Sequence, residues 1–442
     1  MASLPSRGRA VPSGRLARLA AFGSMAGGVA GNMIAGGARA LARGERPSVA
    51  GLLLTPGNAA KITGQLAHLR GAAMKMGQLL SMGSSDLVPT ELSDILARLR
   101  ADGQHMPPAQ LQTVLDKQWG KGWRTRFARF DVRPIAAASI GQVHRAQTRD
   151  GRDLAIKIQY PGVRQSIDSD VDNVATLVRL TGMMPSSLDI APLLSEAKRQ
   201  LHEEADYARE AQCLARFGSL LGDAPDFIVP GLHADLTTSD VLAMDFVPGV
   251  AVESLEDAPQ ATRDRIMTLL LGLLLRELFE FQVMQTDPNF ANYRYDRAQD
   301  RLVLLDFGAT RQFGPEVADR YRRLLVAGMA PDPAAVRADT RDAMLDIGFF
   351  GPDTPEHHQT SIMAMFETGM VPLRMTGMFD FAATDITKQI RDEGLAMAAD
   401  RNFWHLPPAD TLFLQRKFAG LFLLGNRLKA RIDMGALLAP YR

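Results

Sequence analysis

Two polar motifs in the second half of the chain constrain its fold more than any other feature. Leu304-Leu305-Asp306-Phe307-Gly308 places an aspartate at the end of an apolar strand. Upstream, Asp287-Pro288-Asn289-Phe290-Ala291-Asn292 holds an aspartate and an asparagine with four residues between them. A short strand pair is expected between the two motifs. A carboxylate suits Mg²⁺, which prefers hard oxygen ligands together with substrate phosphates. The motifs therefore predict a metal site that uses Asp306.

Two residues farther upstream complete a constellation whose order resembles that of protein kinases. In chain order its members are Lys157 at the end of Leu154-Ala155-Ile156-Lys157, Glu210, Asp287, Asn292 and Asp306. In kinases such a lysine contacts the ATP α- and β-phosphates and pairs with a helical glutamate. The first aspartate orients the acceptor, while the asparagine and the second aspartate hold metal ions. Each residue alone could be a surface charge or a turn former, but their shared order favours nucleotide binding. We therefore expect ATP and Mg²⁺ as cofactors.

Hydrophobic periodicity and turn signals predict an α+β fold, with a small β-containing region ahead of a larger helical one. Helices are expected over 56–99, 108–118, 163–180 and 190–217, and strands over 135–147, 153–159, 227–229 and 240–246. Beyond Pro248-Gly249 we expect almost only helix, apart from short strands near 293–295 and 302–305. The predicted parts are an arm (1–50), a helical extension (51–130), an N-lobe with inserted helices (131–247) and a helical C-lobe (248–442). Met244 and Val247 are expected to bind the nucleotide, together with Lys157 and Glu210.

Departures from the kinase pattern are informative. Where a Gly-rich loop would cover the phosphates, this chain has Ala136, Ala137, Ala138 and Ser139. Alanine resists the positive φ angles that glycine adopts, so this loop should be stiffer and differently placed. Gln285-Thr286 replaces the His-Arg that precedes the catalytic aspartate of kinases. Gly314-Pro315-Glu316 lies too close to Gly308 to end a full activation segment. A platform for a peptide substrate is therefore not expected.

These residues resemble the UbiB/ADCK family, which supports ubiquinone biosynthesis. Its Lys-x-Gly-Gln hallmark matches Lys75-Met76-Gly77-Gln78, and its Glu-x-Asp motif matches Glu204-Ala205-Asp206. The Ala-rich loop and Gln285-Thr286-Asp287-Pro288-Asn289 are also similar to that family, and the match runs from about Gly14 to the end. The resemblance implies a bilobal kinase-like fold whose Lys-x-Gly-Gln helix lies over the active site.

The resemblance also implies that Lys75 and Gln78 meet Glu204 and Asp206 in a lid ion pair, and that Lys75 is a catalytic residue together with Lys157 and Asp287. Two acids would then face one lysine. Lys75→Ala would leave two carboxylates without a partner, and is expected to destabilise the protein more than Glu204→Gln. Without the family, Lys75 would be an ordinary exposed lysine.

The N-terminal arm differs from the rest of the chain. Four arginines lead into an uncharged run from Leu19 to Ala38, which has about transmembrane length but consists mostly of Gly and Ala. Gly23, Gly27 and Gly31 are spaced for close helix approach in lipid. A membrane contact and a flexible Gly-rich arm are both compatible with this pattern, and a homodimer stays open.

The cysteine count and the charge balance limit the cellular compartment and the kinds of partner that the chain can have. The single cysteine, Cys213, excludes a disulfide framework, and 50 basic against 49 acidic residues give no sign of a nucleic-acid partner. The arm resembles the start of the mitochondrial-type branch after leader removal, with too few residues ahead of it for a transit peptide. We therefore expect a bacterial cytoplasmic protein, with peripheral contact to the inner membrane as an option.

Three functions follow from the resemblance. The first is ATP hydrolysis, or phosphotransfer to a small or lipid molecule such as a quinone precursor, alongside other ubiquinone-biosynthesis proteins. The second is a nucleotide-gated scaffold without essential turnover, and the third is a true protein kinase. The intact Lys157, Asp287, Asn292 and Asp306 favour catalysis. The absent peptide platform counts against the third function.

Overall fold

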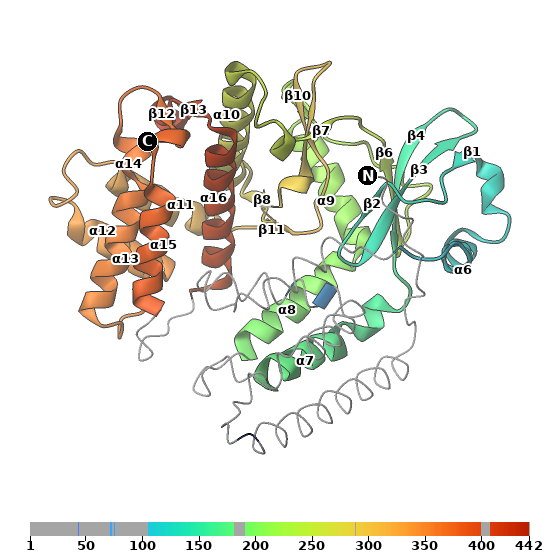
Figure 1. The fold of residues 1–442 in the computed structure, drawn as a ribbon, viewed down its shortest axis with the longest axis horizontal. Helices are drawn as coiled ribbons and strands as arrows, with labels where there is room; N and C mark the ends of the chain where they lie inside the picture. The colour runs from blue at the N-terminus through green and yellow to red at the C-terminus, as the bar shows by residue number, and fades with distance from the viewer. Residues whose placement is uncertain are drawn as a thin grey trace. The chain divides into compact units, whose positions relative to one another are not determined.

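The computed structural model describes residues 43, 71, 72, 75, 105–180, 191–287, 289–398 and 407–441. The chain folds into two compact units. Figure 1 labels the helices and strands of both. The first contains Met1–Ala211 and Leu232–Phe246, and the second contains Gln212–Gly231 and Val247–Arg442. The chain therefore leaves the first unit after Ala211, returns to it for one strand, and leaves it again after Phe246.

The first unit is built on a five-stranded antiparallel sheet in the order β1-β3-β4-β6, with β2 paired to β3. Its elements are α6 (Pro108–Trp119), β1 (Phe127–Phe130), β2 (Ala136–Ala137), β3 (Gly141–Thr148), β4 (Asp153–Gln159), α7 (Val163–Leu180), α8 (Ala191–Glu204), the start of α9 (Tyr207–Leu220) and β6 (Val241–Asp245). The β3–β4 hairpin turns at Gly151, whose φ of +93° is readily adopted by glycine.

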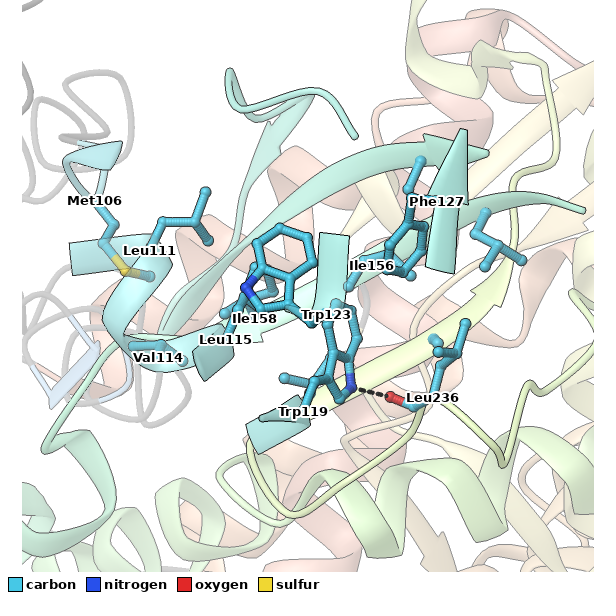
Figure 2. Close-up of a cluster of buried hydrophobic side chains, with 14 of the residues drawn as sticks. Met106, Leu111, Val114, Leu115, Trp119, Trp123, Phe127, Ile156, Ile158 and Leu236 are labelled. Atoms are coloured by element: carbon cyan, nitrogen blue, oxygen red, sulfur yellow. Dashed lines mark hydrogen bonds between the residues drawn. The ribbon is translucent and has the colours of Figure 1, made fainter. Parts of the chain in front are cut away.

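Helix α6 forms because its apolar side chains recur at helical spacing and face the sheet. Pro108 occupies its first turn, where no N–H is needed, and Gly120 ends it with φ +83°. Leu111, Leu115 and Trp119 belong to a buried cluster that also holds strand residues such as Ile156 (Figure 2). The indole N–H of Trp119 donates to the Leu236 carbonyl at 2.9 Å. The core of this unit therefore lies between α6 and the sheet that carries Lys157.

The helix predicted over 190–217 is two helices in the structure. Helix α8 ends at Glu204 and α9 begins at Tyr207. The Asp206 carboxylate accepts from the Arg209 amide at 3.2 Å, so it caps the start of α9. The strand predicted over 135–147 is likewise divided, because Ala138–Ile140 turn back between β2 and β3.

The second unit contains several short sheets among helices. A four-stranded sheet has the order β5-β10-β9-β7, and two separate pairs are β8–β11 and β12–β13. The strands are β5 (Phe227–Ile228), β7 (Val250–Ala251), β8 (Val283–Gln285), β9 (Tyr293–Asp296), β10 (Arg301–Leu304), β11 (Thr310–Gln312), β12 (Phe379–Asp380) and β13 (Arg431–Ile432). The expectation of almost pure helix beyond Gly249 was therefore too simple.

The α-helices of the second unit are α10 (Gln260–Arg276), α11 (Pro315–Gly328), α12 (Arg337–Ile347), α13 (Glu356–Gly369), α14 (Val371–Arg374), α15 (Ile386–Ala398), α16 (Ala409–Leu428) and α17 (Met434–Leu438). Helix α10 continues into a π-helical turn, η3 (Glu277–Phe281). Helices α10 and α16 pack side by side (Figure 1).

Candidate functional site

The first unit holds a buried Lys157–Glu210 pair. Lys157 lies on β4, which pairs with β3 on one side and β6 on the other, so its backbone is fixed by the sheet. Its ammonium donates to both carboxylate oxygens of Glu210 at 2.7 and 2.8 Å. The two side chains are 10% and 2% exposed. The Tyr207 ring lies 5.1 Å from the ammonium. Strand β4 and helix α9 thus bring together the two residues that the sequence predicted as partners.

The Ala-rich loop is a short exposed strand followed by a tight turn. Ala136 and Ala137 pair with β3, and the Ala138 amide donates to the Gly141 carbonyl at 2.9 Å. Every residue of the loop has negative φ, as expected for a loop without glycine. The Ser139 hydroxyl donates to Glu204 Oε2 at 3.1 Å. The loop is therefore tied by its serine to the end of α8.

Lys75 meets the same glutamate from another segment. Its ammonium donates to Glu204 Oε1 at 2.5 Å, and its side chain is 7% exposed against 19% for Glu204. Asp206 does not share this contact, because it caps α9 and lies 3.7 Å from Arg164. Gln78 lies outside the described residues. Within the described part of the chain, one acid rather than the expected two thus faces Lys75, and this acid also binds the Ala-rich loop.

The second unit holds the predicted catalytic loop between β8 and β9. Asp287 Oδ2 accepts from the Asn292 amide at 3.1 Å, so these two side chains contact each other across the loop. Asp287 Oδ1 lies 3.4 Å from the Arg416 guanidinium of α16. Because its amide nitrogen is engaged by Asp287, Asn292 can offer its amide oxygen to a cation.

Asp306 is brought next to this loop by the β9–β10 hairpin. The Leu305 amide donates to the Asn292 carbonyl at 3.0 Å, which joins Asn292 to the residue before Asp306. Asp306 Oδ1 also accepts from the Gly308 amide at 2.9 Å. The Thr286 hydroxyl donates to the Ala309 carbonyl at 2.8 Å, so both motifs are held to one another at two points.

The donor set fits Mg²⁺. Among the described residues no cluster of three or more His, Cys, Asp or Glu side chains is formed. When Mg²⁺ is also bound by substrate phosphates, the protein typically supplies only one or two oxygen ligands. Here these would be one carboxylate oxygen and one amide oxygen. Asp306 and Asn292 are the residues that would hold the ion.

Met244 and Val247 occupy different settings. Met244 lies inside β6 opposite Ala155 and is buried, whereas Val247 follows the strand and is half-buried. Their role at the nucleotide stays a prediction.

Three charged residues beneath the catalytic loop were not predicted from the sequence, namely Glu277, Arg416 and Lys417. Lys417 is 2% exposed although it lies within an apolar helix. The signal that could have revealed it is the adjacent Arg416-Lys417 pair in the run from Phe413 to Leu424. Two cations are unexpected on a buried helix unless acceptors surround them.

The chain matches a family model and several known proteins. The ABC1 atypical kinase-like domain matches residues 98–340, which is more than half of the chain. The chain belongs to the ABC1 atypical kinase-like family. It is 38% identical to the rat protein "Atypical kinase COQ8B, mitochondrial", over 97% of this chain and 80% of that protein. It is 36% identical to yeast "Atypical kinase COQ8, mitochondrial", over 97% and 84%. The predicted UbiB/ADCK resemblance is confirmed.

A solved structure supports the fold. Rv3197 of Mycobacterium tuberculosis, solved in complex with erythromycin, matches with a TM-score of 0.59 and 24% identity. The match covers 86% of this chain and 95% of that one. At this identity the likeness concerns the fold alone, and the predicted α+β kinase-like fold of the ABC1 family is confirmed.

The predicted location was wrong. We expected a bacterial cytoplasmic protein, but four relatives that are 36–38% identical over nearly the whole chain are eukaryotic and named mitochondrial. The expectation rested on the short segment ahead of Gly14, which carries no information on compartment. None of the helices in the described ranges has the length and hydropathy to cross a bilayer. The run from Leu19 to Ala38 lies outside those ranges.

Proposed function

We propose that this chain is an Mg-ATP-dependent kinase-like enzyme that supports ubiquinone biosynthesis, acting as an ATPase or as a phosphotransferase to a small or lipid molecule. The observation that carries the proposal is the buried Lys157–Glu210 pair, in which both carboxylate oxygens accept from the ammonium. In protein kinases this ion pair must be in place for phosphoryl transfer. A buried ion pair usually adds little to the free energy of folding, because the cost of desolvation offsets the attraction between the charges. The presence of this pair therefore favours a role in function.

The chemistry would divide among four residues. Lys157 would neutralise the α- and β-phosphates, and Asp287 would orient the attacking water or hydroxyl. Asn292 and Asp306 would hold Mg²⁺, which offsets charge that develops on the phosphates. The contact between Asp287 and Asn292 supports this division, because one residue then orients the other. A quinone precursor as acceptor, and other ubiquinone-biosynthesis proteins as partners, are part of the proposal on the strength of the COQ8 relatives.

A nucleotide-gated scaffold is the second candidate, and a specific contact favours it. Glu204 accepts from both Lys75 and Ser139, so the 71–75 segment and the Ala-rich loop share one carboxylate. In this scaffold the shared contact would hold the loop still and make nucleotide binding, rather than turnover, the output. A true protein kinase remains the least favoured of the three, because the sequence offers no peptide platform.

Phosphate release from the purified chain distinguishes the first two candidates. We expect Mg²⁺-dependent release in the wild type, raised by anionic lipid or a soluble quinone-precursor mimic, and its loss in Asp287→Asn. The exposed Lys388→Met on α15 is the matched control and should behave as wild type. If wild type and Asp287→Asn both bind nucleotide and neither releases phosphate, the nucleotide-gated scaffold is favoured over the enzyme.

A further inference from the structure

Two oppositely charged side chains are buried beneath the catalytic loop of the second unit. Glu277 is the first residue of the π-helical turn η3 and is 1% exposed, while Lys417 of α16 is 2% exposed. Lys417 Nζ lies 3.6 Å from Glu277 Oε2. π-Helical turns inside helices occur frequently at functional sites, because they redirect side chains at the expense of regular hydrogen bonding.

The Lys417 ammonium contacts both ends of the loop that carries Asp287. It donates to the Gln285 carbonyl at 2.6 Å and to the Gln285 side-chain oxygen at 3.1 Å, immediately before the loop. It also donates to the Tyr293 hydroxyl at 2.7 Å, immediately after the loop. Glu277 Oε1 completes the arrangement by accepting from the Gln285 amide at 3.2 Å. One nitrogen thus joins the two residues that flank the segment from Thr286 to Asn292.

The charge on Lys417 is maintained by its surroundings. Burial alone would lower the pKa of Lys417, but the Glu277 carboxylate and the Tyr293 hydroxyl outweigh burial and raise it. Burial raises the pKa of Glu277, and Lys417 opposes that change. An apolar pair of similar volume would usually fold as well as a buried ion pair. Stability therefore does not explain why this helix carries a lysine here.

We propose that Lys417 is a positioning residue, which sets the separation of the two ends of the loop and thereby the placement of Asp287 and Asn292. The proposal rests on the proposed function for its catalytic consequence. Removing the ammonium releases both Gln285 and Tyr293 and lets the loop widen. The Asp287 carboxylate is then still present but no longer held in position to orient the attacking water or hydroxyl. The rate of turnover should therefore fall more than the affinity for nucleotide.

The test separates positioning from folding with a charge-neutral double variant. Glu277→Gln/Lys417→Met leaves no buried charge without a partner, so it should lose less stability than Lys417→Met alone, which leaves the buried Glu277 carboxylate without its cation. We expect kcat for phosphate release to fall about tenfold or more, the usual effect of losing a residue that supports a metal site, and KM for ATP to rise by a smaller factor. Amide hydrogen exchange should rise within the 286–292 segment and remain unchanged elsewhere. Lys388→Met again serves as the control.

Two further results make the outcome decisive. Tyr293→Phe removes one acceptor and keeps the ring, so it should change kcat and exchange in the same direction by a smaller factor, even if the double variant fails to fold. Wild-type exchange in a folded double variant, or in Tyr293→Phe if the double variant is unfolded, would overturn the proposal. Absence of phosphate release from wild type would instead refute the proposed function, and hydrogen exchange would still decide whether Lys417 positions the loop.

Discussion

Glu204 offers a quantitative test of the two contacts that it makes, with Lys75 and with Ser139 of the Ala-rich loop. The sequence predicted that Lys75→Ala would be more harmful than Glu204→Gln, because two acids would be left without a partner. Among the residues that the structure describes, only Glu204 faces Lys75, and Lys75 is the more buried partner. Glu204→Gln therefore leaves a buried ammonium beside a neutral amide, whereas Lys75→Ala leaves a carboxylate that still accepts from Ser139. The predicted order of the two variants reverses.

The magnitude follows from burial. Removing one partner of a deeply buried pair destabilises a protein by about 3–5 kcal/mol. Since the Glu204 side chain is 19% exposed, we expect a value near the lower end for Glu204→Gln and a smaller one for Lys75→Ala. The neighbouring Glu203 pairs with Arg199 on the more exposed side of α8, so Glu203→Gln should change stability by about 1 kcal/mol or less.

Urea denaturation monitored by tryptophan fluorescence measures these differences in the free energy of unfolding of the first unit. Trp119 and Trp123 both lie in the core of the first unit, so in a Trp404→Phe background the fluorescence reports its unfolding. Equal free energies of unfolding for Glu203→Gln and Glu204→Gln would refute the reasoning. So would a larger loss for Lys75→Ala than for Glu204→Gln.

Three more outcomes follow from the first unit. Ala138→Gly relaxes the φ restriction of the loop and should change nucleotide preference, with self-phosphorylation appearing; unchanged affinity and phosphorylation would make the loop a mere strand connection. Gly141→Ala should unfold the first unit at lower urea, since a Cβ there would lie 2.8 Å from the Tyr207 hydroxyl and closer still to the Ile158 carbonyl; an unchanged midpoint would contradict this. Burial lowers the pKa of His144 from its ordinary 6.5, so the unfolded state binds the proton more readily and stability should fall as pH drops below about 6.5. His144→Gln should lose that part of the pH dependence, and an identical pH profile would argue against it.

The elements with local signals could be predicted from the sequence. Helix α6 has a proline at its start, a glycine at its end and regular apolar spacing, and the β3–β4 hairpin has its turn at Gly151. The Lys157–Glu210 contact could be predicted because the sequence indicated both the strand that carries Lys157 and the helix that carries Glu210.

The features that could not be predicted depend on tertiary contacts. The break between α8 and α9 comes from Asp206, which could equally have been an ordinary helix-surface acid. Strands β8 and β11 are three residues each and exist only because they pair with each other. The role of Lys417 depends on acceptors far away in the chain, and no spacing rule reveals them.

Thermal stabilisation by Mg-ATP tests the central claim most directly, when wild type is compared with Asp306→Asn. Asp306 accepts from the Gly308 amide, and asparagine can also accept there, so the variant should fold while losing the anionic metal ligand. We predict that Mg-ATP raises the melting temperature of wild type, that the effect needs Mg²⁺, and that it is lost in Asp306→Asn. The same Mg²⁺-dependent stabilisation in both proteins would contradict the assignment of the site.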